Sequence, residues 1–510
     1  MLMVLAAVIS ILFAAGCGSS GRPAPANPVG FSSSSLSGTY VFSYSGEDAN
    51  GAFLAVAGAL VANGSGGITG GTMDVVNQEF TPPSPIAQAI TGGSYSVGSD
   101  GRGKATLNSS VGSVTVDFVL TSSSHGLVSE FDSNATGSGT LDIQTAVPSL
   151  SQLAGPYAFS LAGIDANGYP FATAGSFTLN SSGSTTAGVQ DFNDAGIPYA
   201  AQTLTGTATS GSGTGPGAIA LSSTFGTLKF DFYPIDSTHL KFIETDYTTA
   251  ILAGDVFSQT SASIPKGAMV FTMAGGVSAP IAVGGLMTSD GTGNFTGGLE
   301  DVNNNGAVSV AQVPFTGSAA AGGSVGGRVI VNLSGFVPAT QWVIYPSSGG
   351  LLMLETDSAT VTLGTAYAQT SVALAASQNY GLNLSAFNTS GGFEEDDIAQ
   401  FTTTSTGFTG VVDINDDASL SPGQALSGSY TPPDTTGRGA ATTTANNSAF
   451  VSFVFYVVNS STVLLVETDT NQIGAGTFEL QNVPGSGGAA QSRISIVRPA
   501  VRPHAALRSR

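Results

Sequence analysis

Apolar and polar residues alternate along most of the chain, in short runs that end at turn sequences. Residues 155–161, 174–179 and 227–232 have an apolar side chain at every second position. A period of two residues is the pattern of a half-buried β-strand, and no run here has the length and 3.6-residue period of a helix. Polar turns rich in Gly, Asn, Asp and Ser separate the runs, which predicts neighbouring strands paired as antiparallel hairpins.

One seven-residue pattern that ends in Glu-x-Asp occurs four times in the sequence. Its steps are 114, 111 and 112 residues, counted between the glutamates Glu130, Glu244, Glu355 and Glu467. A regular period of this kind indicates one structural unit copied in tandem. We therefore predict an all-β chain of four repeats, each an antiparallel meander of about eight strands. The predicted repeats are residues 36–146, 151–262, 265–371 and 377–483.

An open sheet in each repeat would have two edge strands with unpaired backbone N–H and C=O groups. Pairing of the last strand with the first removes both edges, so we expect a small up-and-down β-barrel, with a two-sheet β-sandwich as the alternative. The Gly-x-Tyr-x-Phe sequence of Gly38, Tyr40 and Phe42 resembles the Gly-x-Trp start of lipocalin-like barrels. Four such units in a row predict a semi-rigid rod.

The N-terminal segment has the features of an export signal. Residues 2–15 form an apolar run that is too short for a membrane-spanning helix, and Ala14-Ala15-Gly16-Cys17 follows. This resembles the lipobox of bacterial lipoproteins. The resemblance implies a signal peptide over 1–16, lipidation of Cys17, a flexible tether over 17–35, and anchoring to the bacterial cell envelope, at the outer membrane or cell surface. The alternative is an ordinary cleaved signal with an incidental cysteine.

Charge is scarce and unevenly placed. Of 13 Lys and Arg residues, Arg22 lies in the leader and five lie within 493–510, so seven remain in the body against all 33 acidic residues, a net charge of −26. Such a body repels phosphate backbones, which argues against nucleic-acid partners. Residues 484–510 are predicted to be a disordered basic tail. This tail either contacts anionic envelope polymers or the acidic body, or is simply solvated.

The Glu-x-Asp strands predict buried carboxylates. The period of two puts each glutamate on the apolar face of its strand, where a carboxylate is costly unless it is paired. The partners that we expect are arginines on the preceding hairpin, and in the second repeat Lys229 or Lys241 would have to replace them. The alternative is a carboxylate pair for acid–base chemistry, as in glycosidases. The expected structural pairs join Glu130, Glu355 and Glu467 to Arg102, Arg328 and Arg438.

A second recurring motif alternates Asp and Asn. Residues 301–306 match the first half of a calcium-binding loop, but Gln312 occupies the place of the final bidentate glutamate. The alternative is a hairpin turn in which the Asx side chains bond their own backbone. Calcium is the only cofactor that the sequence indicates. The calcium ligands that this match would supply are Asp301, Asn303, Asn305, Asp191, Asn193, Asp413, Asn415 and Asp417.

The sequence marks no catalytic set. It has three histidines, His125, His239 and His504, and no phosphate loop, dinucleotide turn or His/Cys metal cluster. We therefore expect a lipid-anchored envelope protein with a structural, adhesive or binding role and without catalysis. Its expected partners are the membrane, through the lipid anchor, and an envelope or extracellular polymer or protein. The alternatives are a carrier of a hydrophobic ligand inside the barrels and a hydrolase that uses one carboxylate pair.

Overall fold

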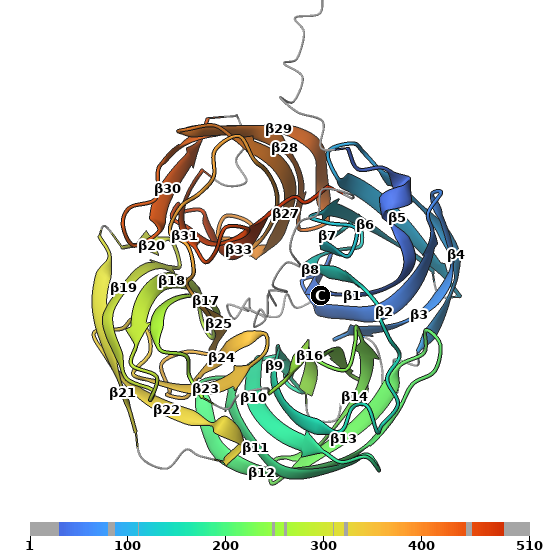
Figure 1. The fold of residues 1–510 in the computed structure, drawn as a ribbon, viewed down its shortest axis with the longest axis horizontal. Helices are drawn as coiled ribbons and strands as arrows, with labels where there is room; N and C mark the ends of the chain where they lie inside the picture. Colours follow the sequence, from blue (N-terminus) through green and yellow to red (C-terminus); the bar gives the residue numbers. More distant parts are fainter. Residues whose placement is uncertain are drawn as a thin grey trace, which may run out of the picture.

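The computed structural model places four β-barrels in a closed ring (Figure 1). It describes residues 30–79, 87–110, 112–246, 250–259, 263–309, 311–320, 325–444 and 451–483. Cys17, the predicted signal peptide and the predicted basic tail lie outside these residues. No helix in the described part of the chain is long and apolar enough to span a membrane.

Barrels 1 and 2 each contain eight antiparallel strands in sequence order. A short 3-10 helix, η1 (Ser33–Ser35), precedes barrel 1. The strands of barrel 1 are β1 (Ser37–Asp48), β2 (Phe53–Asn63), β3 (Gly67–Asn77), β4 (Gln88–Val97), β5 (Arg102–Ser109), β6 (Gly112–Leu120), β7 (His125–Asp132) and β8 (Ala135–Ile143). Those of barrel 2 are β9 (Gly155–Asp165), β10 (Pro170–Leu179), β11 (Ser184–Asp194), β12 (Ile197–Thr209), β13 (Gly217–Ser223), β14 (Gly226–Pro234), β15 (His239–Glu244) and β16 (Ala250–Ser258).

Barrels 3 and 4 repeat this order. In barrel 3 a two-residue strand, β20, and a 3-10 helix, η2 (Val325–Gly327), are added, and pairing of β18 with β19 closes the sheet. Its strands are β17 (Gly267–Gly276), β18 (Pro280–Ser289), β19 (Phe295–Asn304), β20 (Ala307–Val308), β21 (Val313–Ala319), β22 (Val329–Ser334), β23 (Gln341–Ser347), β24 (Gly350–Glu355) and β25 (Thr362–Ala368). Those of barrel 4 are β26 (Asn379–Asn388), β27 (Phe393–Thr403), β28 (Gly407–Asp416), β29 (Ser419–Thr431), β30 (Arg438–Thr443), β31 (Ser452–Val457), β32 (Thr462–Glu467) and β33 (Gln472–Leu480).

The first strand of each barrel pairs with the last, so the predicted fold of four closed barrels is confirmed and the sandwich is not formed. In barrel 1, for example, Tyr40 of β1 faces Ile143 of β8. Alternate residues point inward and fill each barrel with aromatic and aliphatic side chains. Tyr40, Tyr157 and Tyr380 start the first strands of three barrels and are all buried in those cores.

The barrels form a ring, so the expected rod is wrong. The first three strands of each barrel contact the last three of the next, and β26–β28 of barrel 4 contact β6–β8 of barrel 1 in the same way. Such a head-to-tail contact closes a ring when its rotation divides a full turn. We call each contact between neighbouring barrels a joint. Three joints have large apolar clusters, whereas at the joint of barrels 4 and 1 the described cluster is Val119, Leu127 and Ile398.

Candidate functional site

The Asp/Asn motif of each barrel lies at a joint. In barrel 2, Phe192 of β11 points into the core, so its neighbour Asp191 points outward to barrel 3. There Arg328 donates from Nε and Nη2 to the two carboxylate oxygens of Asp191, at 2.6 and 2.5 Å. Tyr345 of β23 donates its hydroxyl to the same carboxylate. Burial and the charge of Asp191 hold the pKa of Tyr345 well above its usual value, so the phenol keeps the proton that it donates.

The joint between barrels 3 and 4 has the same arrangement. Arg438, the first residue of β30, donates from Nε and Nη2 to Asp301, with both distances 2.7 Å. Tyr456 of β31 donates its hydroxyl to Asp301, and the hydroxyl oxygen also lies 2.9 Å from the carbonyl oxygen of Gly284. A bidentate Arg–carboxylate pair of this kind fixes the orientation of the two barrels as well as holding them together.

The other two joints each lack one partner. At the joint of barrels 4 and 1, Arg102 Nη1 is 3.5 Å from Asp413 Oδ2, and Val119 occupies the place of the tyrosine. At the joint of barrels 1 and 2, Tyr233 donates to Asp74 at 2.6 Å, and the described contacts include no arginine there. Burial raises the pKa of Asp74 to about 7, although the hydrogen bond from Tyr233 opposes the shift.

The expected Glu–Arg pairs are therefore wrong, because the arginines bind the aspartates of the preceding barrel. The glutamates point into their own barrels, where Glu130, Glu244, Glu355 and Glu467 are almost fully buried. Glu355 accepts from Thr362 Oγ1 at 2.7 Å and from the Thr360 backbone at 3.1 Å. Burial raises the pKa of Glu355 to about 9. This carboxyl is therefore protonated at neutral pH.

In barrel 2, neither lysine binds the buried glutamate. Glu244 sits beside Asp246, and burial followed by that neighbouring charge raises the pKa of Glu244 well above its usual value. Lys229, more than half exposed, lies 3.4 Å from Asp246, and Lys241 pairs with Asp255.

The asparagines of the Asp/Asn motif bind the turn that follows the Glu-x-Asp strand of the next barrel. Asn193 Nδ2 donates to the carbonyls of Glu355, Asp357 and Thr360, at 3.2, 3.1 and 2.9 Å. Asn303 makes the corresponding three bonds to barrel 4, and Asn415 bonds two carbonyls of barrel 1. The two motifs that recur in the sequence thus meet across the joints.

Several of the side chains proposed as calcium ligands already bind other groups of the protein. Asn303 Oδ1 accepts from the backbone N–H of Gly306 at 3.0 Å, so the side chain bonds the backbone of its own turn. Asn305 and Asp417 adopt left-handed backbone angles, with φ of 51° and 50°, as turn residues do. Among the described residues, no group of three or more His, Cys, Asp and Glu is arranged to hold a metal ion. Calcium binding at these turns stays a prediction.

A glutamine just after the last strand of each barrel was missed by the sequence reasoning. Gln369 Nε2 donates to the carbonyls of Thr436 and Val457 in barrel 4, at 2.9 and 2.8 Å. Gln481 donates to Asp100 and Leu120 of barrel 1, both at 2.8 Å. Gln144 and Gln259 bond the next barrels in the same way. The signal was present in the sequence, because these glutamines recur with nearly the same period as the glutamates.

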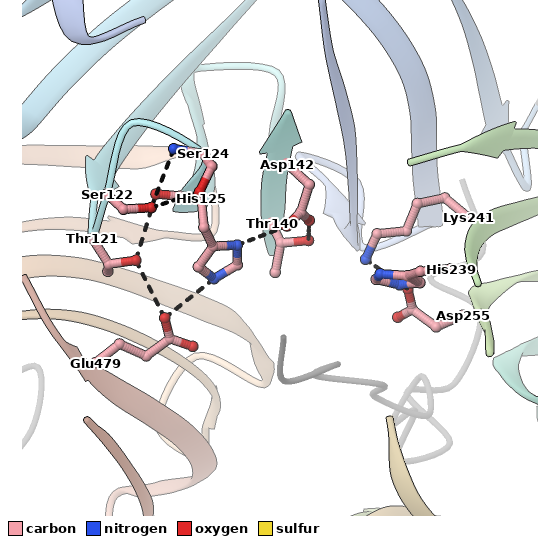
Figure 2. A network of polar contacts seen from close by, with 10 residues as sticks. All are labelled: Thr121, Ser122, Ser124, His125, Thr140, Asp142, His239, Lys241, Asp255 and Glu479. Atoms are coloured by element: carbon pink, nitrogen blue, oxygen red, sulfur yellow. Dashed lines mark hydrogen bonds and ion pairs between the residues drawn. The ribbon is translucent and has the colours of Figure 1, made fainter. Parts of the chain in front are cut away.

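A charged cluster holds barrels 4 and 1 together near the ring axis (Figure 2). His125 Nδ1 is 2.8 Å from Asp142 Oδ1, and His125 Nε2 is 3.2 Å from Glu479 Oε2 of barrel 4. Burial alone would lower the pKa of His125, but the two carboxylates outweigh it and raise the pKa to about 10. His125 is therefore an imidazolium ion that bridges the two barrels, and Thr121 also donates to Glu479.

A second cluster belongs to barrel 2 and lies beside the first in Figure 2. Lys241 Nζ is 2.6 Å and His239 Nε2 is 2.7 Å from Asp255 Oδ1, with all three side chains buried. Burial lowers the pKa of His239, so this imidazole is neutral and donates to the carboxylate. The positive charge of Lys241 also helps to keep the pKa of Asp142 low, after His125.

Barrel 4 holds two further buried acids beside its repeated glutamate, Glu467. Glu395 of β27 stands where the other barrels have Leu54, Phe171 and Ile281, and Asp397 stands where they have Val56, Thr173 and Val283. Both acids are buried close to Glu467. Burial, followed by the charge of Asp416, raises the pKa of Glu395 to about 8. Burial, followed by the charge of Glu395, raises the pKa of Asp397 well above its usual value. These groups are stable in the fold only as neutral acids.

Side chains fill the barrel interiors. The cavities described inside barrels 1 and 4 measure about 20 Å³ each and are lined by apolar residues such as Phe42, Leu60, Phe401 and Phe455. Such a volume has room for one or two water molecules, since a water needs roughly 10–15 Å³ in this measure.

No protein-family model matches the chain, and no curated protein matches its sequence. Among solved structures it is similar to a double mutant of the vaccine antigen transferrin binding protein B from Haemophilus parasuis. The identity is 8%, the TM-score 0.14, and the match covers 72% of this chain and 82% of that one. A TM-score this low carries no argument about function.

Apart from the buried glutamates, most of the polar residues that recur between the repeats form contacts between barrels. The aspartates, arginines, tyrosines, asparagines and glutamines that recur at the joints bind one another or backbone carbonyls. Hydrogen bonds of this kind between buried groups fix a geometry, because each group left unpaired would cost stability.

Proposed function

We propose that the chain is an exported, lipid-anchored protein of the bacterial cell envelope that works as a rigid, non-catalytic scaffold. Cys17 with its preceding small residues supports the anchor. The observation that carries the scaffold is the use of the repeated polar residues at the joints, where Asp191 and Arg328 are both buried and paired. An enzyme would instead keep such groups accessible to a substrate.

The ring would present its outer strands and loops to an envelope polymer or protein. The acidic body favours a partner with basic groups, because carboxylates dominate its charge. A carrier role has less support, since the cavities inside barrels 1 and 4 are too small for an organic ligand. A hydrolase role has less support as well, since Glu244 and Glu355 lie buried inside their barrels.

The test is cell fractionation of bacteria that express the full chain or its Cys17→Ser variant. The scaffold proposal expects the native chain in the membrane fraction with an N-terminal lipid mass, and the variant in the soluble exported fraction. Equal distribution of both chains, or an unmodified cysteine in the mature protein, would rule out the anchor. The purified chain is also assayed for glycan hydrolysis. Hydrolysis by the native chain that is lost in the Glu355→Gln variant would rule out the non-catalytic role.

A further inference from the structure

A cavity of about 60 Å³ lies on the axis of the ring. It is lined by residues of barrels 1, 3 and 4, among them Ser45, Gly275 and Ser385. Barrels 1 and 3 stand on opposite sides of the ring in Figure 1. A cavity that touches both therefore belongs to the axis, and no single barrel encloses it.

The cavity combines apolar walls with negative charge. Phe53, Ile281 and Ile473 contribute to the walls, and the carboxylates of Glu47 and Glu394 are among the lining groups. No Lys or Arg is among the lining residues. Glu47 also departs from the repeat, because its register position in the other first strands holds apolar side chains or glycine. Such a site suits a ligand that carries both an aliphatic side chain and a cation.

The sequence beyond Val483 contains a segment that combines aliphatic side chains with positive charge. Residues 484–510 contain five arginines and no Asp or Glu, and 493–502 interleave Arg493, Arg498 and Arg502 with isoleucines and valines. A segment joined to its own binding site has a high effective concentration there, so weak charge pairs suffice to hold it.

The length of chain also fits. Val483 packs beside Gly30 on barrel 1, at the end where β1 begins, whereas Glu47 lies where β1 ends. At roughly 3.3 Å per residue, the strand between these ends spans about 35 Å. About ten extended residues beyond Val483 cover the same distance and bring the segment that starts at Arg493 level with the cavity.

We propose that residues 493–502 dock across the mouth of the axial cavity, with one aliphatic side chain in the cavity and arginines on Glu47 and Glu394. The ring then carries its own occupant, and any basic, aliphatic partner segment has to displace it. The proposal does not depend on lipidation of Cys17 or on the scaffold role.

Hydrogen exchange followed by mass spectrometry tests this, comparing the full chain with a chain that ends at Val483. The shorter chain keeps every described strand. Docking predicts faster exchange in the shorter chain at 45–53, 274–281, 385–394 and 473–475, and recovery when a synthetic peptide of residues 489–510 is added. Unchanged exchange at these segments, or changes at another surface instead, would overturn the proposal.

Paired variants of the full chain locate the contact. Glu47→Gln together with Glu394→Gln is expected to speed tryptic cleavage after Arg493 several-fold, with cleavage after Arg508 unchanged as an internal control. Glu79→Gln, on the surface of barrel 1, is the matched control and is expected to leave both rates unchanged. Equal cleavage rates in the double variant and in the native chain would also overturn the proposal.

Discussion

The side chain of Gln481 in barrel 4 donates a hydrogen bond to the carbonyl of Leu120 in barrel 1, across a sequence separation of 361 residues. The same kind of bond joins Gln369 to Val457 at a joint where the two barrels are consecutive in the chain. The ring is therefore closed by the interaction that its linked barrels already use.

Removing this glutamine tests the closure. Gln481→Ala leaves two buried carbonyls without their donor, and we expect a loss of about 1–3 kcal/mol of stability. Because the apolar cluster at this joint is small, we also expect the ring to open. Small-angle X-ray scattering would record a larger radius of gyration, whereas Gln424→Ala, on the exposed outer strand β29, should scatter like the native chain.

The arginines at the joints should differ in energy. Arg328 and Asp191 are both nearly fully buried, so Arg328→Met strands a buried charge and is expected to cost about 3–5 kcal/mol. Arg102→Met should cost less than about 1 kcal/mol, because that pair is longer and partly exposed. Urea denaturation measures both. Equal losses would contradict the assignment, and adding Asp191→Leu to Arg328→Met should restore part of the stability.

His125 should make the joint between barrels 4 and 1 sensitive to alkali. Its pKa rises from an ordinary 6.5 to about 10 in the fold, so its stabilising effect is complete below the ordinary value. The effect is lost as the pH rises through about 10. Stability should therefore fall as the pH rises between these two values in the native chain, and it should fall less in His125→Gln. If the dependence of unfolding free energy on pH is the same in His125→Gln as in the native chain, groups other than His125 cause it.

The buried glutamates should make the protein more stable in mild acid than in alkali. A carboxyl such as Glu355, with a pKa raised from 4.5 to about 9, binds more protons folded than unfolded between these values. Stability therefore falls as the pH rises across this window. Glu355→Gln removes this contribution to the pH dependence of stability. We therefore expect the variant to melt at a higher temperature than the native chain at alkaline pH only. Calorimetry against pH measures this, with the exposed Asp290→Asn as control.

The Asp/Asn turns give a direct test of calcium. If Asn193 and Asn303 are committed to backbone groups as the structure places them, calcium and a chelator should give the same melting temperature. A calcium-dependent rise that Asn305→Ala removes would instead establish a site at the turn of barrel 3.

The sequence carries the local features of this fold and little of its assembly. Strand alternation and the spacing of Glu130 and its counterparts lie within one repeat, so they predict the barrels. The partner of Arg328 was misassigned because Glu355 is close to it in sequence, while Asp191, 137 residues earlier, is its neighbour in space. The rotation between barrels leaves no local period in the sequence, and the recurrence of Gln481 and its counterparts marks the glutamines but not the carbonyls that accept their hydrogen bonds.

Head-to-tail joints between barrels also fix the number of copies. A stack of repeats can gain or lose a unit at its end, because each unit contacts only its neighbours. In the ring, a fifth barrel would separate Gln481 from Leu120, and the loss of one barrel would force a larger rotation at each of the three joints that remain. The ring geometry therefore suits four copies, and new surfaces can arise by sequence changes within individual barrels without a change in their number.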